Sequence, residues 1–575
     1  MPKRGSIALT VALAALFALP AVAQAASEAL VTNGSPTTPF SQNKQNEPSV
    51  AVNPRNHQVL VAGSNDNIDN TPCDGNDCSF TPGVGGSGVY FSFDGGTSWT
   101  QPTYQGWSGR DGTPGPGPIG TLPHYFEHGL VADGDPGIAF GPRRENGVFR
   151  WSNGARVYYS NLASNFSTER SESTFKGFEA ITISHADRLH RAANDHAGAW
   201  SDPVIVTQRR QSQTTFSDKP SIAVDTARSS PGFGNVYSCY SRFNSQNPIG
   251  PIKIAFSRST DGGRTFSRPK DLSSAASQPT QDGRQGCAVA TDSHGVVYAV
   301  WEDIVQKHSV FRMAKSFDGG RTFGKSRVVA QVTDVGTFDE VRSFSFDGIA
   351  GARTSSFPSL SIANGAPSGN NAPNTIALGW SDGDLNDEHA LVQLSDNGGQ
   401  TWSGPTEAEQ SGDRPDFAFL GISPNGQDLY LVYDAFLDPF RDDTTSARRF
   451  QGVTRHADVS GTTLSSLSTL DRGGIGDARA SSANALIDEF IGDYNAVAAT
   501  NGGAVSVFND ARNAAVCPKI NTFRQDVATT GTADQFGEDD RDAPPGGGTP
   551  PTAPAPGTDC GPTFGNTDIF AAVVP

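Results

Sequence analysis

Charged and aromatic residues recur at one position of a pattern that the chain repeats. Segments such as "EPSVAV" from Glu47 and "DKPSIAV" from Asp218 each begin an alternating apolar run. When seven copies are aligned on that run, one column holds residues of both charge signs and two aromatic rings: Glu47, Asp135, Lys219, Arg284, Phe357, Arg414 and Tyr494. Such a column predicts a site to which several repeats each contribute one reactive or charged side chain.

The arginines predict which guest such a site would hold. Arg284, Arg353 and Arg414 come from consecutive repeats of a chain whose net charge is -17. Guanidinium groups bind carboxylates through two parallel hydrogen bonds, so three of them facing one cavity predict an anionic guest. A second reading stays open: residues such as Asp413 and Arg414 cap strand ends and pair with one another.

The repeats also predict the elements that position these residues. Short alternating apolar runs that end in Gly, Asp or Asn recur throughout, which is typical of an all-β chain. Each copy supplies two adjacent strands, and several continue into a third and a fourth. This predicts a β-propeller of four-stranded blades, with seven blades favoured and six if the first or last pair is a partial sheet. Because the first strand of each blade lines the central channel, the column should converge on one mouth.

A second motif recurs between the later strands. It reads "SFDGGTSW" from Ser92, "STDGGRTF" from Ser259, "SFDGGRTF" from Ser316 and "SDNGGQTW" from Ser395, and "NDHAGAW" from Asn194 is a degenerate fifth copy. The glycines permit positive φ, the carboxylate can accept hydrogen bonds from the turn's N–H groups, and the aromatic ring can pack between sheets. We therefore predict structural roles for Asp94, Asp261, Asp318 and Asn397.

This motif resembles the Asp-box, or bacterial neuraminidase (BNR) repeat, of sialidase-like propellers. The resemblance implies that the boxes lie between the third and fourth strands, away from the ligand. Sialidases hold a sugar carboxylate with three arginines, attack with a tyrosine and use an aspartate as acid/base catalyst. By resemblance, Tyr494 would attack, Asp493 or Glu489 would accept its proton, and Asp135 would be the acid/base group, with Glu47 as second choice. The substrate-binding residues would be Arg284, Arg353, Arg414 and Asp218.

Three functions remain open. The first is an exo-acting glycoside hydrolase on an acidic sugar such as sialic acid. The second is a non-catalytic extracellular propeller that binds a glycan or a protein, because the Phe/Tyr-Arg-Ile-Pro stretch of sialidases is absent and Glu47 stands in the first blade. The third is a polysaccharide lyase with a Tyr or His base.

The N-terminus predicts export. Lys3 and Arg4 precede an apolar run and the small residues "AVAQAAS", so residues 1–25 form a signal peptide cleaved near Ala23 or Ala25. We expect a secreted or periplasmic monomer without membrane insertion. Residues 28–575 would form one propeller, with a Pro/Gly-rich insertion at 536–559 before the closing strand.

Six cysteines in an exported chain favour disulfides. Cys73 and Cys78 bracket a short loop, Cys517 and Cys560 flank the Pro/Gly-rich stretch, and Cys239 and Cys287 remain as the third pair. The negative net charge disfavours nucleic acid as a partner.

Two further motifs could hold metals, although we expect no cofactor and no metal ligand. "HYFEH", from His124 to His128, has the spacing of a zinc peptidase motif, but its Gly- and Pro-rich surroundings predict a loop in place of the required helix. A loop with Asp66, Asp69, Asp74 and Asp77 could bind structural calcium, although a solvated acidic loop is favoured.

Overall fold

The computed structural model contains seven antiparallel sheets arranged as a seven-bladed β-propeller. It describes Met1 and residues 26–73, 75, 78, 80–167, 174–207, 211–244, 252–273, 285–305, 308–339, 344–347, 351–530 and 551–575. The predicted all-β class and the favoured number of blades are therefore confirmed.

Blades one to three comprise the following strands, from the innermost outward. They are β2 (Gln45–Val52), β3 (Leu60–Asp66) and β4 (Ser87–Ser92); β8 (Gly137–Glu145), β9 (Val148–Asn165), β10 (Ala180–Ala186) and β11 (Val204–Ile205); and β12 (Thr215–Val224), β13 (Val236–Asn244), β14 (Lys253–Ser259) and β15 (Lys270–Asp271). An isolated bridge from Phe91 to Thr100 stands where blade one would have its fourth strand.

Blades four to seven follow the same order. They are β16 (Gln285–Thr291), β17 (Val297–Val305), β18 (His308–Ser316) and β19 (Arg327–Val332); β23 (Ser359–Ile362), β24 (Ile376–Asp382), β25 (His389–Ser395) and β26 (Thr406–Glu407); β27 (Arg414–Ile422), β28 (Asp428–Phe436), β29 (Arg449–Ser460) and β31 (Ser468–Arg472); and β33 (Ala496–Thr500), β34 (Gly503–Asp510), β35 (Asp568–Val574) and β1 (Ser27–Leu30).

Shorter elements decorate the sheets and the connections between them. They are β5 (Tyr104–Ser108), β6 (Gly115–Ile119), β7 (Leu130–Ala132), β20 (Thr337–Asp339), β21 (Phe344–Phe346), β22 (Arg353–Thr354), β30 (Thr463–Leu464) and β32 (Gly476–Asp477), the helices α1 (Leu189–Ala192), α2 (Pro518–Thr530) and α3 (Pro556–Asp559), and the 3₁₀ turns η1 (Asn67–Asp69), η2 (Phe126–His128), η3 (Ala197–Ala199) and η4 (Ala478–Ala480).

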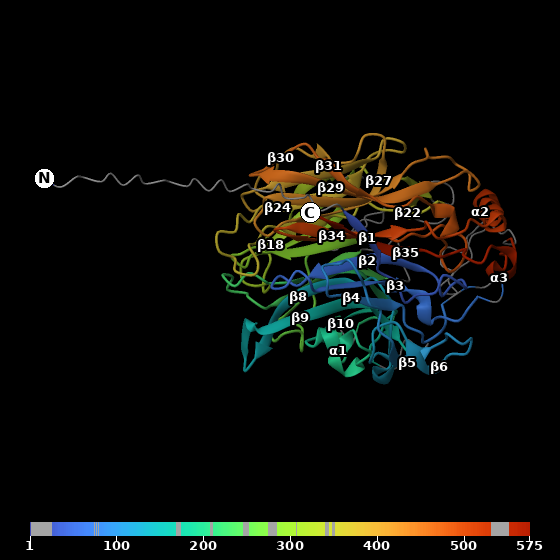
Figure 1. Ribbon diagram of the computed structural model, residues 1–575, viewed down its shortest axis with the longest axis horizontal. Coiled ribbons are helices and arrows are strands. Elements are labelled where there is room, and N and C mark those ends of the chain that lie inside the picture. The colour runs from blue at the N-terminus through green and yellow to red at the C-terminus, as the bar shows by residue number, and fades with distance from the viewer. Residues whose placement is uncertain are drawn as a thin grey trace.

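The two ends of the described chain close the ring. Each inner strand contacts the next one around the axis, and β33 contacts β2. β1 pairs with β35, with Ser27 opposite Val573, so the N-terminal strand is the outermost strand of the last blade (Figure 1). The C-terminal run that forms β35 is predicted from the sequence as the closing strand of this blade, whereas β1 is not predicted, because four residues carry too little of an alternating pattern.

The hydrophobic core lies between the blades, since each sheet buries one face against the sheet before it and the other against the sheet after it. Between blades four and five, for example, Phe311 and Met313 pack with Trp380, and the rings of Phe311 and Trp380 meet edge to face. The first strands are thus held close to the axis by packing on both faces.

The Asp-box turns have the predicted hydrogen bonds. In blade four, Asp318 accepts from the Thr322 backbone N–H at 2.9 Å and from its hydroxyl at 2.6 Å. Phe323 packs on Phe256 of blade three, with ring centroids 4.7 Å apart. Asp94, Asp261 and Asn397 accept the same backbone bond in blades one, three and five. The degenerate copy differs, because Asp195 accepts from the Thr103 N–H.

All three predicted disulfides are present: Cys73–Cys78, Cys239–Cys287 and Cys517–Cys560. The second joins β13 to β16, and so links blades three and four. Disulfides are typical of proteins that fold outside the cytosol. The predicted signal peptide falls on residues 2–25, which lie outside the described residues.

A long segment separates β34 from β35 and contains α2 and α3, which lie together at one edge of the molecule (Figure 1). The predicted Pro/Gly-rich insertion belongs to this segment, and its residues 536–550 lie outside the described part. Among the described residues, no helix combines the length and apolar character needed to cross a membrane.

Candidate active site at the mouth of the propeller

The inner strands share an irregular backbone where they begin. A one-residue bulge interrupts β2, β12, β16 and β27 after their first residues. Glu47 and Lys219 take positive φ at these bulges, and Asp135 does so just before β8. Positive φ is uncommon for such residues, and strained backbone is enriched at functional sites. Bulges also change the direction of a side chain.

The strand pairing corrects the column that the sequence alignment gave. The residue two positions before the regular pairing resumes is Glu47, Asp135, Lys219, Gly286, Phe357, Phe417 or Tyr494 in the seven blades. Gly286 and Phe417 therefore stand where the alignment had placed Arg284 and Arg414. The alignment had matched Gln285 and Pro415 with Pro48 of blade one, whereas the pairing places Cys287 and Ala418 at that position. Arg284 itself lies outside the described residues.

Asp493 gathers two cations at the mouth. Arg353 donates to its carboxylate from Nε at 3.0 Å and from a terminal nitrogen at 2.6 Å, and Lys219 donates at 2.9 Å. Only 2% of the Asp493 side chain is exposed, against 26% for Arg353. A backbone bridge between Ala352 and Glu489 holds the two segments that carry Arg353 and Asp493 side by side.

Glu47 and Asp135 form a carboxyl pair next to this cluster. Their side chains are close enough that the charge of Glu47 raises the pKa of Asp135. Asn65 connects them, because its amide nitrogen donates to Glu47 at 2.6 Å and its amide oxygen accepts from the Asp135 backbone N–H at 2.7 Å. Glu47 also accepts from the Asp493 backbone N–H at 2.9 Å. The hydroxyl of Tyr494 lies 3.4 Å from Asp135 Oδ2, so the tyrosine and the two acids are neighbours at the mouth.

Tyr494 lies in an aromatic slot that fixes its ring. Phe357 stacks on it and Phe419 meets it edge to face, each with ring centroids 6.1 Å apart. The Lys219 ammonium lies 5.7 Å from the ring centroid of Tyr494 and 5.2 Å from that of Phe357. The slot therefore offers both an apolar wall and a positive charge near the ring of Tyr494.

The electrostatics of the mouth raise the pKa values of the two acids beside the tyrosine. Burial, and then the charges of Glu47 and Asp218, raise the pKa of Asp135 well above its usual range. Burial and the charge of Asp493 raise the pKa of Glu47. Burial and the neighbouring carboxylates raise the pKa of Tyr494. Burial alone would also raise the pKa of Asp493, but Arg353 and Lys219 outweigh it and lower that pKa to about 2.

The remaining candidates lie at different distances from this centre. Asp218 is at the mouth, 3.6 Å from the Lys219 ammonium. Arg414 binds Glu388 through two nitrogens and Asp347 through one, and it shares no partner with Arg353. Glu489 is fully buried and faces Arg448 at 3.4 Å. The structure thus brings together Glu47, Asp135, Asp218, Arg353, Asp493 and Tyr494, whereas Arg414 and Glu489 have separate partners.

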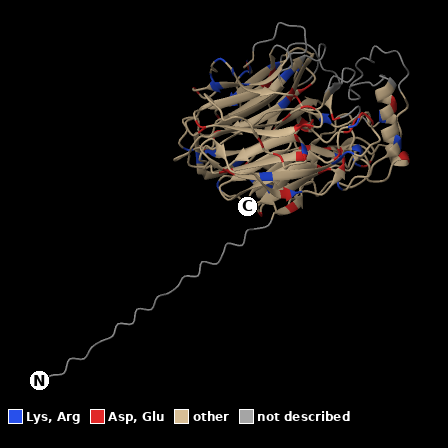
Figure 2. Ribbon diagram, turned by 90° about the horizontal axis from the view of Figure 1, so that it is seen from above, with Lys and Arg blue, Asp and Glu red and all other residues tan. Residues whose placement is uncertain are grey.

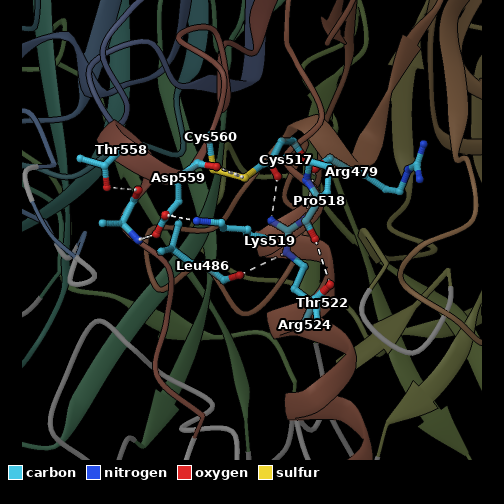
Figure 3. Close-up of a disulfide and its surroundings, with 12 residues drawn as sticks. Arg479, Leu486, Cys517, Pro518, Lys519, Thr522, Arg524, Thr558, Asp559 and Cys560 are labelled. Carbon is cyan, nitrogen blue, oxygen red and sulfur yellow. Dashed lines mark hydrogen bonds and ion pairs between the residues drawn. A yellow bond between two sulfur atoms is a disulfide. The ribbon is translucent and has the colours of Figure 1, made fainter.

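The insertion after β34 supports the segment that ends in Asp493 and Tyr494. Arg524 of α2 is fully buried and donates to the backbone carbonyls of Leu486, Ser481 and Asp488. Figure 3 shows this arginine beside the Cys517–Cys560 disulfide and the loop that carries Leu486. No sequence pattern indicated this role, because a helical arginine normally predicts an exposed face.

The described residues of the two predicted metal motifs bind protein groups. The carboxylate oxygens of Asp66 and Asp69 accept hydrogen bonds from protein groups, among them Tyr90 and Arg110. Asp74 and Asp77 lie outside the described residues. In "HYFEH", the His124 ring bonds to the Ala197 carbonyl and the His128 ring faces Asp202. The helix required of a peptidase motif is here the three-residue turn η2.

Comparisons with known proteins give distant likenesses. No family model matches the sequence, and no curated protein matches it. The Hadza microbial sialidase Hz136 is 13% identical, with a TM-score of 0.39 over 68% of this chain and 63% of that one. The arabinofuranosidase Arb93a from Fusarium graminearum is 11% identical, with a TM-score of 0.40 over 72% of this chain and 92% of that one.

A polysaccharide lyase of family PL25, an ulvan lyase, is 13% identical, with a TM-score of 0.34 over 64% of this chain and 76% of that one. The chain thus spans less than two thirds of the Hz136 sialidase. The proteins named have different activities, and at such low similarity none of these activities transfers to this chain. Membership in the sialidase-like family stays a prediction.

Proposed function

We propose that this protein is an exported glycoside hydrolase of sialidase-like type whose chemistry is carried by Tyr494, Asp135 and Glu47. The single observation that carries the proposal is the Tyr494 hydroxyl 3.4 Å from Asp135 at the mouth, with Glu47 in contact behind it. A phenol needs a base to become a nucleophile. When Tyr494 attacks, its proton passes to Asp135, and the proton of Asp135 passes to Glu47.

The surroundings suit the transition state of glycoside hydrolysis. That transition state carries positive charge on the sugar ring, which carboxylates stabilise. Glu47 and Asp493 lie close enough to raise the pKa of Tyr494. Asp218, in its protonated form, is the group we assign to protonating the leaving oxygen, because its side chain is 16% exposed at the mouth whereas that of Glu47 is 3% exposed.

The proposed substrate is an acidic sugar, and Arg353 with Lys219 would bind its carboxylate. The substrate carboxylate would have to compete with Asp493 for these two cations, because both already bind it. The test is hydrolysis of a panel of fluorogenic acidic and neutral glycosides by the mature protein and by Asp135→Asn. We expect turnover of at least one acidic glycoside and a loss of about a hundredfold or more in Asp135→Asn.

A non-catalytic glycan-binding propeller is the second candidate. The raised pKa of Tyr494 keeps its hydroxyl protonated, and the Arg353 guanidinium is already bound to Asp493, and both observations favour this candidate. Two results together would replace the first proposal with this one. They are no hydrolysis of any glycoside in the panel, and binding of an acidic oligosaccharide that Arg353→Ala abolishes. Ultraviolet-absorbing unsaturated products would identify a lyase instead.

A further inference from the structure

A basic cavity of about 740 Å³ lies between blades four and five. Its lining includes Arg312, Lys315, Lys325 and Arg327, and no acidic residue belongs to the lining. The chain as a whole has 60 acidic and 43 basic residues, and Figure 2 shows the two kinds interleaved over the sheets. A concave surface with four cations and no carboxylate is therefore a local reversal of the protein's charge.

Two of the four cations of the cavity bind protein groups, and the other two are exposed to solvent. Arg312 pairs with Asp303 at 2.5 Å, and Lys315 donates to the Gly398 carbonyl at 2.8 Å. Lys325 and Arg327 are exposed, and neither forms an ion pair with a described residue. Burial and the nearby Arg327 lower the pKa of Lys315, although the charge of Asp292 opposes this shift.

An exposed aromatic ring borders the same cavity. Phe317 belongs to the lining and is 75% exposed, and its ring centroid lies 5.7 Å from the Lys315 ammonium. The matching residue in blade one, Phe93, stacks on His190 at 4.0 Å, and blades three and five have Thr260 and Asp396 there. Phe317 is thus the aromatic residue at this box position that is left open to solvent.

We propose that this cavity binds a short anionic saccharide, with Lys325 and Arg327 holding its sulfate or carboxylate groups and Phe317 contacting the face of a sugar ring. Its volume falls within the usual range of ligand sites, about 300 to 1,000 Å³. The net charge of -17 repels a long polyanion such as DNA, so a short ligand held inside the cavity fits better.

The cavity is separate from the mouth. β16 begins at the mouth and the strands of blade four alternate in direction, so β18 ends at the opposite face, where Lys315 and Phe317 stand. The proposal therefore does not depend on catalysis at Tyr494. The cavity would be a second binding site for a charged glycan, in addition to the mouth.

The test is calorimetric titration of the full mature protein with a heparin-derived tetrasaccharide and with its desulfated counterpart. The double variant Lys325→Ser/Arg327→Ser is compared with Arg268→Ser/Lys270→Ser, which changes the matching positions after the Asp-box of blade three. A hydrogen bond to a charged group is worth about 1.5 kcal/mol or more, so each lost cation should weaken binding about tenfold. Phe317→Ser should weaken it severalfold, and thermal stability should not change.

Three results would overturn the proposal. They are equal binding of the sulfated and desulfated probes, equal loss of affinity in the two double variants, and tighter binding of a single-stranded oligonucleotide than of the tetrasaccharide. Binding that persists in Arg353→Ala would show that the cavity, and not the mouth, holds the probe.

Discussion

At the scale of single residues, Asp493 decides what the mouth can bind. It accepts hydrogen bonds from Arg353 and Lys219 together, so these two cations, which the described part of the chain places at the mouth, are already paired. A substrate carboxylate has to displace Asp493 from at least one of them. This is a residue-level difference from an open arginine cluster, and it is the reason that neutral glycosides belong in the activity panel.

Glu489 is the residue with the clearest expected effect on stability. Its side chain is fully buried, neither carboxylate oxygen has a hydrogen-bond donor among the described residues, and burial raises its pKa to about 7 despite Arg448 and Arg524. In the unfolded chain the group ionises near pH 4.3. The folded state therefore binds more protons between these values, and stability falls as the pH rises through this window.

The matching prediction concerns Glu489→Gln, which removes the ionisable group. At pH 8 the variant should be more stable than the parent by about 3 kcal/mol, the cost of ionising a group with this shift in pKa. At pH 4 the two proteins should unfold at the same denaturant concentration. Urea unfolding at both values measures this, and a gain of equal size at both would show that the carboxylate does not titrate as described.

At the scale of elements, the strand register explains which site residues could be predicted from the sequence. Glu47, Asp135, Lys219 and Tyr494 were found because each precedes an alternating run directly. Arg414 was assigned to the same column because Pro415 was matched with Pro48, but the regular pairing of β27 resumes at Phe419 and places Phe417 there. Register follows from backbone pairing across two strands, which one strand's own pattern does not record. Asn65, which donates to Glu47, and Arg524, which donates to the loop before Asp493, also belong to distant segments of the chain.

The disulfides should differ in their effect because they close loops of different length. Cys517 and Cys560 are 43 residues apart, and Cys73 and Cys78 are 5 apart. On the chain-entropy estimate, losing the first costs about 4 kcal/mol and losing the second about 2 kcal/mol. Thermal melts of Cys517→Ser/Cys560→Ser and Cys73→Ser/Cys78→Ser measure the order. A larger loss in the second variant would contradict it.

The Asp-box turn gives a prediction that separates structure from activity. Gly320 has a φ of 79°, and a Cβ there would lie 2.8 Å from the Phe256 ring. Gly320→Ala should therefore destabilise the fold by about 1 to 2 kcal/mol from its backbone conformation alone, and more from the contact. Its kcat and KM below the melting temperature should equal those of the parent, because the turn lies on the face opposite the mouth. A changed KM would link the boxes to substrate.

At the scale of the whole molecule, the ring is what makes a site from residues that are far apart in sequence. Tyr494 and Asp135 are 359 positions apart, and their meeting requires that β33 and β8 flank β2 at the axis. The repeat of the pattern predicted this ring, because each sheet needs a neighbour on both faces. The closure by β1 could not be predicted, since a short strand is recruited by an edge that only the complete ring presents.

The whole molecule also presents two faces with different properties. The mouth combines carboxylates, two cations bound to Asp493 and the buried support of α2, whereas the Asp-box face has tight turns and the basic cavity of blade four. If both proposals hold, a charged glycan could contact the protein at two places that do not compete.

The most direct measurement is the kcat of Tyr494→Phe on the best glycoside of the panel, beside the control Tyr298→Phe. Tyr298 also donates to a carboxylate, that of Asp292 at 3.0 Å, but it lies in blade four away from the mouth. The account predicts that Tyr494→Phe lowers kcat by at least about a thousandfold and that Tyr298→Phe leaves it unchanged. Equal activity of Tyr494→Phe and the parent would contradict the account.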